Sequence, residues 1–190
     1  MATNSFTPAH FCSVVKNTFY FNETDLASDS FMMANNFRQC WIQCKSNKFL
    51  LLNDDRQFQE EVLSIDQLQT QPECKFHIQY YNDSSLIRKQ GRAVMLYVLK
   101  DGEKMMACCS EKHDVYSEAL DLPKEIKENT HKAVFYMKRL PSTSDKHIFE
   151  STLFPSWFLA LESDGNDSSL HKLVLSHDGM DESCEFSFSQ

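Results

Sequence analysis

The sequence predicts an all-β domain, and three observations support that prediction. From residue 38 onward, twelve apolar segments of roughly five to eight residues follow one another at short, regular intervals. The gaps between them are rich in Asn, Asp, Ser, Gly and Pro, which are the residues that form turns. Several segments alternate apolar and polar side chains with the period of two that is typical of a half-buried strand. Twelve such strands fit a sandwich, a barrel or a β-trefoil of three four-stranded repeats, and no strong internal repeat selects one.

The alternation is clearest in residues 74–81, where Phe76, Ile78 and Tyr80 share one face and His77 lies on the opposite, solvent-facing side. His171 takes a similar solvent-facing position in another segment. In chain order, the expected strands are residues 38–44, 48–52, 58–65, 74–81, 92–99, 104–110, 114–120, 132–139, 147–151, 157–162, 171–176 and 184–189. The side chains expected to be mostly buried are Phe76, Ile78, Val94, Leu96, Phe135, Phe149, Phe158, Leu159, Leu173, Val174, Phe186 and Phe188.

Two stretches depart from the strand pattern. Residues 1–37 are polar and acidic and show no sustained period, so we expect a flexible arm ahead of the domain. The stretch "LPKEIKEN" (122–129) places Pro123 in a first-turn position before good helix formers, which predicts a short helical turn.

Length and charge limit the function. The 190 residues allow one well-buried domain with a tail, and the net charge of −8 argues against nucleic acid or an anionic membrane as a partner. The N-terminus lacks the basic and apolar regions of a secretory signal, and no segment approaches the roughly 18 apolar residues of a membrane span. The seven cysteines are an odd number, so reduced thiols made in the cytosol are expected.

Motifs for catalysis or metal binding are largely missing. The sequence has no nucleophile elbow, zinc-protease helix, phosphate-binding loop or paired Cys-x-x-Cys, so we expect no catalytic residues, no cofactor and no enzyme activity. The best metal candidates are Cys108 and Cys109 with His113, followed by Cys40 and Cys44. Their spacing resembles none of the usual structural zinc sites, so buried thiols are the simpler interpretation and no metal is expected.

The segment "FESTLFPSWFLAL" (149–161) carries a resemblance to a known family. An aromatic residue is followed by Ser two positions on, by Pro four later, and then by Phe-Leu-Ala. This pattern resembles the C-terminal signature of the interleukin-1 family of cytokines; the matching residues are Phe149, Ser151, Pro155, Phe158, Leu159 and Ala160. The resemblance extends from about residue 40 to the end and implies a β-trefoil, in which Pro155 and Ser156 form an exposed turn between two core strands.

The resemblance implies a pro-inflammatory cytokine that binds a receptor chain of immunoglobulin-like domains and recruits an accessory chain. A soluble binding protein is a further implied partner. The implied receptor-binding residues are Gln43, Lys45, Asn47, Glu60, Glu61, Arg88, Lys89, Arg92, Lys138 and Arg139. For the accessory chain, Lys112 alone matches a basic residue of the family. Another family member, agonist or antagonist, and a non-cytokine intracellular β-trefoil binding module remain as alternatives.

Within the family, the chain is most similar to a branch whose members are made as precursors without a signal peptide. The sequence "LASD" (26–29) followed by Ser30 resembles the site that an inflammatory caspase cuts in that branch, with Asp25 as the nearest competitor. We therefore expect residues 1–29 to be a pro-segment and residues 30–190 to be the cytokine domain. The resemblance implies a cytoplasmic precursor, cleavage between Asp29 and Ser30, and secretion of the mature form.

Overall fold

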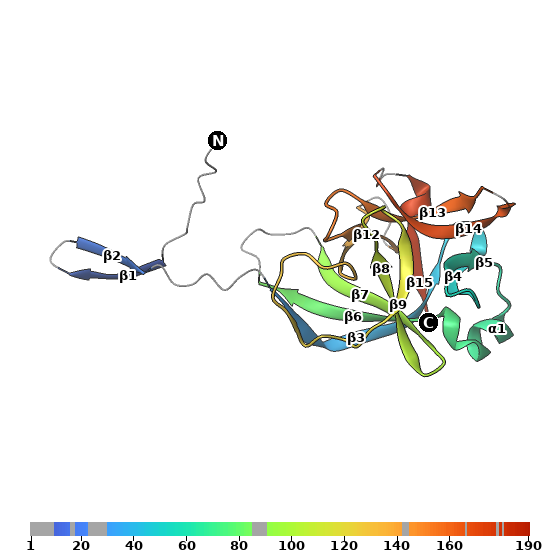
Figure 1. Ribbon diagram of the computed structural model, residues 1–190, viewed down its shortest axis with the longest axis horizontal. Coiled ribbons are helices and arrows are strands. Elements are labelled where there is room, and N and C mark those ends of the chain that lie inside the picture. The colour runs from blue at the N-terminus through green and yellow to red at the C-terminus, as the bar shows by residue number, and fades with distance from the viewer. Residues whose placement is uncertain are drawn as a thin grey trace.

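The computed structural model describes residues 10–15, 18–22, 30–84, 91–141, 145–165, 167–177, 179 and 181–190. Within these residues the chain is almost entirely β-structure, arranged in two sheets, and one short α-helix lies at an end of the larger sheet near β4 and β5 (Figure 1). The strands are β1 His10–Val15, β2 Thr18–Asn22, β3 Phe31–Gln43, β4 Phe49–Leu52, β5 Phe58–Glu61, β6 Lys75–Asp83, β7 Arg92–Lys100, β8 Glu103–Cys109, β9 Val115–Ala119, β10 Glu125–Ile126, β11 Phe135–Arg139, β12 Lys146–Ser151, β13 Phe158–Asp164, β14 Asp167–Ser176 and β15 Phe186–Ser189.

Six of the strands close into a ring. Strand β3 pairs with β6, β6 with β7, β7 with β11, β11 with β12, β12 with β15, and β15 returns to β3. Every one of these pairings is antiparallel. A closed barrel has no free strand edge, so the backbone polar groups of the ring are satisfied internally.

The remaining strands of the large sheet form three hairpins and one short addition. The hairpins β4–β5, β8–β9 and β13–β14 each follow a ring strand, and β5 also pairs with β14. An isolated bridge between Asp114 and Val174 brings the β9 hairpin to the same place. Each third of the chain therefore supplies two ring strands and one hairpin. This threefold arrangement is a β-trefoil, as the family resemblance implied, and β10 is the one described strand added to it.

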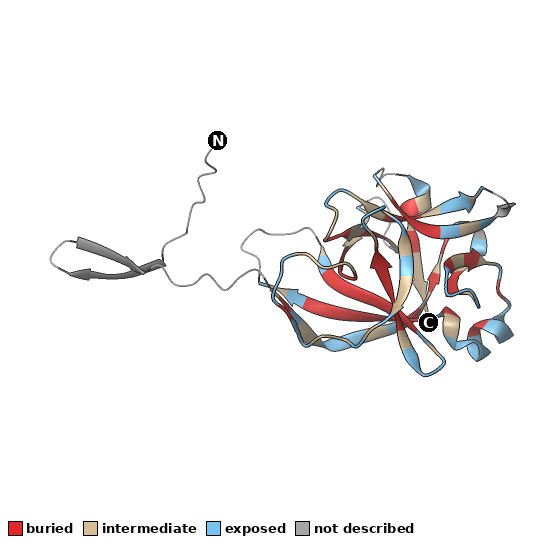
Figure 2. Ribbon diagram, viewed as in Figure 1, coloured by how far each residue is buried: buried red, intermediate tan, exposed pale blue. Residues whose placement is uncertain are grey.

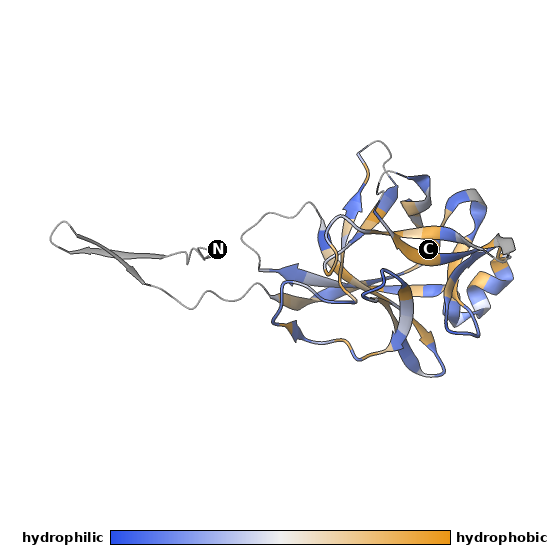
Figure 3. Cartoon of the chain, turned by 45° about the horizontal axis from the view of Figure 1, so that its top comes forward, coloured by the Kyte–Doolittle hydropathy of each residue, from blue (hydrophilic) through white to orange (hydrophobic). Residues whose placement is uncertain are grey.

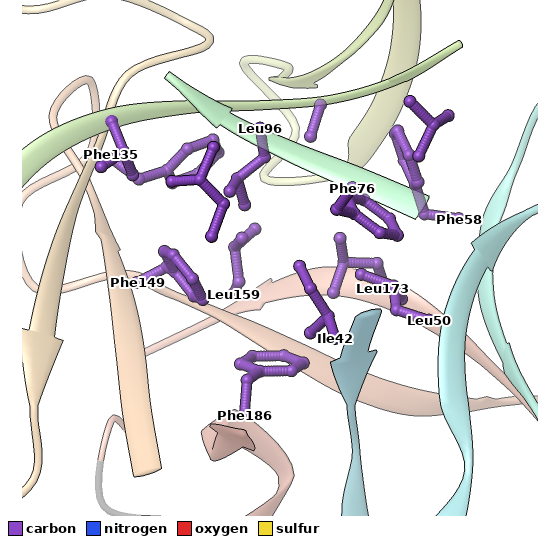
Figure 4. Packing of buried hydrophobic residues seen from close by; sticks show 14 of the residues in the cluster. Ile42, Leu50, Phe58, Phe76, Leu96, Phe135, Phe149, Leu159, Leu173 and Phe186 are labelled. Atoms are coloured by element: carbon purple, nitrogen blue, oxygen red, sulfur yellow. The ribbon is translucent and has the colours of Figure 1, made fainter. Parts of the chain in front are cut away.

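The main hydrophobic core fills the barrel and the space between the barrel and its hairpins. Ring strands contribute Phe76, Leu96 and Phe149, and the hairpins contribute Leu50 and Phe58, among others (Figure 4). Phe149 is 1% exposed and lies against Phe186, with ring centroids 5.8 Å apart. Apolar residues occupy the inner strands, whereas the loops and the helix carry most of the hydrophilic residues (Figure 3).

A second cluster lies on the outer side of β6, β7 and β8. It contains Phe31, Met95, Met106 and Tyr136, together with Ile126 of β10. The segment 120–134 covers this side, so β6 and β7 are buried on both faces instead of alternating with solvent (Figure 2).

The prediction for His77 was wrong because the outer face of β6 is covered. His77 is 8% exposed, and its ring stacks on Tyr97 at 4.7 Å and faces Phe37 at 6.5 Å. Burial lowers the pKa of His77, and Lys75 and Lys104 lower it further. His171 is half-buried and sits beside Glu60.

Ten of the twelve side chains predicted to be mostly buried are buried, and two are partly exposed. Phe158 and Phe188 are half-buried and pack at the margins of their clusters. Phe158 begins β13 at the rim of the barrel, where its ring covers the backbone of Gly179 so closely that a Cβ atom there would collide with it.

The aromatic segment that follows β12 forms a turn, as the sequence predicted. Ser156 has a φ of 67°, and its N–H donates to Oε1 of Glu150 (2.8 Å). The polar pair that precedes the turn is buried but satisfied: the N–H of Phe154 donates to Oγ of Ser151 (3.1 Å), and Oγ1 of Thr152 donates to the carbonyl of Val134 (2.9 Å). The residues of this signature are therefore structural.

The helix was predicted in the wrong place. The stretch 122–129 contains the extended strand β10 instead, and the α-helix α1, Ile65–Thr70, begins at the last residue of the segment 58–65 that was expected to be a strand. Ser64 caps α1: its Oγ accepts from the N–H of Gln67 (3.2 Å), while the side chain of Gln67 accepts from the N–H of Ser64 (2.9 Å).

The N-terminal arm is shorter and more ordered than predicted. Strand β3 begins at Phe31 instead of residue 38, and its first residues pair with β6 on one side and with β10 on the other. Ahead of it, β1 and β2 form an antiparallel hairpin that is a sheet of its own. Asp25 and Asp29, the two candidate cleavage positions, lie outside the described residues.

Candidate functional site

The described cysteines do not form a reactive or metal-binding site. Burial raises the pKa of Cys40 to about 11 and those of Cys108 and Cys109 to about 12, so these thiols stay protonated near neutral pH. Cys108 and Cys109 belong to different hydrophobic clusters, on opposite faces of β8. Across the described part of the chain, no group of three or more His, Cys, Asp or Glu side chains could hold a metal ion.

The first group of candidate receptor-binding residues surrounds the turn between β3 and β4. The side-chain amide of Gln43 donates to Oδ1 of Asn47 (3.0 Å), and Asn47 holds a φ of 59°. Lys45 forms an exposed ion pair with Glu182, whose hydrogen bond raises the pKa of Lys45. The turn therefore presents Gln43, Lys45 and Asn47 together. An exposed pair of this kind contributes little stability, so these side chains are free to exchange partners.

Glu60, which the resemblance places in the same group, differs from these three residues in being buried. It is 7% exposed, and its Oε1 lies 3.0 Å from Nζ of Lys48 and 3.0 Å from Nδ1 of His171. A buried carboxylate engaged by two side chains supports the contact between β5 and β14, where Glu60 stands opposite His171. Its neighbour Glu61 is half-buried and accepts from the side chain of Gln59. Glu60 is therefore a structural residue with little surface to offer a partner.

The second group, which we call the basic edge, comprises Arg92, Lys138 and Arg139. Arg92 begins β7 directly opposite Met137 of β11, which places it beside Lys138. The guanidinium of Arg92 is exposed and lies 4.3 Å from the ring centroid of Tyr80, which fixes its direction. The residue before Arg92, Gly91, lets the start of β7 lie close to β11, because a Cβ atom at that position would lie 3.0 Å from the carbonyl oxygen of Met137.

The two other basic-edge residues differ in availability. Lys138 is half-buried and forms an ion pair with Glu150 on β12, whereas Arg139 is exposed. Arg88 and Lys89, which the sequence predicted for the same surface, lie outside the described residues. Tyr80 and Glu150, which contact the basic edge, were not among the receptor-binding residues predicted from the sequence. The position of Tyr80 in the strand before the basic turn could have indicated its contact with Arg92.

Lys112, the candidate for the accessory chain, lies in a different hairpin from the other candidates. It occupies the exposed turn between β8 and β9, where its N–H donates to Oγ of Ser110 (3.2 Å). The same turn leads to Asp114, which borders a hollow of about 250 Å³ between β5, β9 and β14. Arg56, Tyr116 and Lys172 also line this hollow, and none of the three was identified from the sequence.

The family model described as Interleukin-1 / 18 matches residues 65–188 of the chain. The chain belongs to the interleukin-1 family. Interleukin-18 of Mus musculus is 29% identical over 164 residues, which cover 85% of this chain and 80% of that protein. Interleukin-18 of Bos taurus is 30% identical over 165 residues, which cover 85% and 81%. The crystal structure of chicken interleukin 1 beta matches with a TM-score of 0.61 at 16% identity, covering 84% of this chain and 99% of that one.

These matches confirm the resemblance seen in the sequence. The chain is an interleukin-1 family cytokine close to interleukin-18, and like its family it is not an enzyme. Membership in the family also excludes the alternative of a non-cytokine β-trefoil module. Among the described residues, no helix is both long and apolar enough to cross a membrane.

Proposed function

We propose that this chain is the precursor of a secreted pro-inflammatory cytokine that binds an interleukin-18-type receptor. The receptor chain would be built of immunoglobulin-like domains, and binding would recruit a similar accessory chain. A soluble binding protein would compete for the same surfaces. The precursor would stay in the cytoplasm until an inflammatory caspase cuts after Asp29, and the mature form would leave the cell without a signal peptide.

The basic edge is the observation that carries the receptor proposal. On a chain with a net charge of −8, Arg92, Lys138 and Arg139 gather at the paired ends of β7 and β11. Arg88 and Lys89 precede Arg92 directly in the sequence. Clustered charge of one sign speeds encounter with an oppositely charged partner and fixes its orientation, but adds little to stability. A stable receptor interface buries about 1,600 Å² in total, so these charges would form its polar part.

The turn that carries Gln43, Lys45 and Asn47 supplies a second contact, and Lys112 beside its hollow supplies the accessory contact. In this proposal the basic edge and the β3–β4 turn contact the receptor chain, and the β8–β9 turn contacts the accessory chain. Glu60 is left out of this assignment because its carboxylate is buried against Lys48 and His171. Glu61 remains in it, since its side chain is only half-buried.

The receptor proposal is tested by the association rate of the mature fragment with an immobilised interleukin-18-type receptor. Lys89→Glu combined with Arg92→Glu should slow association by about tenfold at low salt and by less at high salt, because exposed charges are screened. The matched control is Lys75→Glu with Lys172→Glu, two exposed lysines on β6 and β14 that give the same change in net charge. Equal slowing in both variants would show a general charge effect and would refute the basic edge as the receptor site.

The precursor proposal is tested by caspase digestion of the folded full-length chain. Cleavage should create a new N-terminus at Ser30, and Asp29→Ala should abolish it while Asp25→Ala should not. Tight turns inside the trefoil should resist the enzyme, because an aspartate there enters a protease cleft only after local unfolding. Cleavage after Asp25, or a folded precursor that is not cut, would remove the activation step from the proposal.

A further inference from the structure

The chain around Ser30 is anchored to the sheet although it lies at the proposed cleavage point. The backbone N–H of Ser30 donates to Oγ of Ser84 (2.8 Å). In return, the backbone N–H of Ser84 and its hydroxyl both donate to the carbonyl of Ser30, at 3.0 and 3.1 Å. One hydroxyl can both donate and accept, so the two residues, 54 positions apart, close a small ring of hydrogen bonds.

The residue that follows is fixed even more firmly. Phe31 is 1% exposed, and its ring lies 6.3 Å from that of Tyr136. It stands between two strands, opposite Asp83 of β6 and opposite Ile126 of β10. Burial of a phenylalanine at this level contributes enough to hold the strand start in place without any help from the preceding residues.

Asp83 places a carboxylate beside this anchored strand start. Its Oδ2 accepts from the hydroxyl of Tyr136 (2.8 Å), which directs the carboxylate toward the outer cluster where Phe31 lies. The other charged groups near β3 come from β10 and its flanks: Glu125 stands opposite Met32, the carbonyl of Lys124 accepts from the N–H of Met33 (2.9 Å), and Lys127 follows. Lys124, Glu125 and Lys127 are all exposed.

We propose that Ser84 and Asp83 form a docking site for the α-amino group that cleavage after Asp29 creates at Ser30. This inference rests on the proposed cleavage position. Hydrolysis adds water across the Asp29–Ser30 peptide bond, leaves a carboxylate on Asp29 and turns the N–H of Ser30 into an ammonium group. The ammonium group keeps the acceptor that the N–H already has, the hydroxyl of Ser84, and gains two further donors.

Docking has a consequence that depends on pH. A free α-amino group has a pKa of about 7.7–8.0, and a nearby carboxylate favours its charged form. The pKa of the docked group should therefore be raised above that range. The stabilisation is fully present below the ordinary pKa of the amino group and disappears as the pH rises through the raised value. At neutral pH the new chain end is charged and held on the sheet.

The experiment uses the full chain and does not depend on the caspase. Residues 24–29 are replaced by the recognition sequence of a protease that cuts before serine, and the folded protein is then cut to leave Ser30 as the first residue. The rate at which an amine-reactive reagent labels this α-amino group is followed from pH 6 to pH 10 by mass spectrometry of the N-terminal peptide. The same product in denaturant gives the ordinary reactivity.

The expected result is a pKa about one unit higher in the folded product and labelling at pH 7.5 at least fivefold slower than in denaturant. Asp83→Asn and Ser84→Ala should each return the pKa toward the denatured value, with Asp101→Asn, an exposed aspartate in the β7–β8 turn, as the control that changes nothing. Circular dichroism shows whether each variant is folded. If Ser84→Ala does not fold, the pKa measured for Asp83→Asn alone tests the docking site.

Equal pKa values in the folded and denatured products would overturn the docking site, as would a folded Asp83→Asn variant that behaves like the parent. Either outcome leaves the caspase proposal untouched, because the cut is made by another protease. Conversely, a precursor that resists the caspase at Asp29 would overturn the activation step while the labelling result stands.

Discussion

Two aromatic residues of the signature segment, Phe149 and Phe158, should contribute very differently to stability. Phe149 lies inside the barrel at 1% exposure, with ring contacts to Phe186 at 5.8 Å and Phe188 at 6.1 Å. Phe158 lies nine residues later at the rim, half-buried, with its ring over Gly179. The sequence pattern treats both as core residues, whereas the structure separates them. Replacing each with alanine tests that difference.

The magnitudes follow from burial. Truncating a fully buried phenylalanine to alanine costs about 3–5 kcal/mol, because apolar contacts are lost and a cavity remains. The ring contacts of Phe149 place its replacement toward the upper end of that range. Phe158 is only partly buried and lies at the margin of its cluster, so its replacement leaves a less enclosed cavity and the expected cost is roughly 1–2 kcal/mol. With a total stability of about 5–15 kcal/mol, both losses are measurable.

Urea unfolding followed by far-ultraviolet circular dichroism gives both values in one experiment. With a slope of about 2 kcal/mol per molar urea, Phe149→Ala should lower the midpoint by about 1.5–2.5 M and Phe158→Ala by about 0.5–1 M. The slope itself should stay constant, which shows that the same surface unfolds in each variant. Equal shifts for the two variants, or a larger shift for Phe158→Ala, would refute the assignment of Phe158 to the rim.

Three further predictions concern charge and thiols. Burial lowers the pKa of His77, His131 and His147, so the unfolded chain binds more protons than the folded one. The free energy of unfolding should therefore fall as the pH drops from 7.5 to 5. His77→Phe should make the urea midpoint depend less on pH. Glu60→Gln should cost about 1–3 kcal/mol in the same assay yet leave receptor association unchanged, since the carboxylate is buried between two partners. The six buried cysteines, Cys40, Cys44, Cys74, Cys108, Cys109 and Cys184, should resist a thiol reagent at pH 8 for hours in the folded protein and react within minutes in denaturant. Fast labelling of any of these six without unfolding would contradict their burial.

The strand pattern was predictable because it depends on local rules. Apolar segments of strand length, separated by turn formers, placed all twelve trefoil strands, although not their ends. The covering of a second face was not predictable in this way. Alternation in β6 shows that one face is apolar, but only the tertiary structure shows that residues 120–134 cover part of the other face and that Tyr97 and Phe37 flank His77 there.

The misplaced helix has a clear physical reason. Residues after Pro123 have good helix propensity, but Ile126 is needed opposite Phe31, and this pairing outweighs a weak local preference. The true helix follows Ser64, with Gln67 three positions later, which is the sequence signature of a capping box. Ser64 lies in the segment 58–65, whose apolar residues also predict a strand, and the capping signal was therefore overlooked.

The candidate site residues also differ in whether tertiary contacts leave them exposed. Residues such as Arg92 and Lys112, carried over from the family resemblance, lie at exposed ends of strands and turns, where the barrel leaves side chains free to meet a partner. Glu60 was carried over in the same way, but the pairing of β5 with β14 brings it against His171. The sequence suggests a surface glutamate at this position, whereas the carboxylate is buried in the structure. In a closed trefoil each hairpin must pack on the next, so charged residues at hairpin contacts serve the fold. Arg92, at the outer end of a ring strand, has no such hairpin contact and stays exposed.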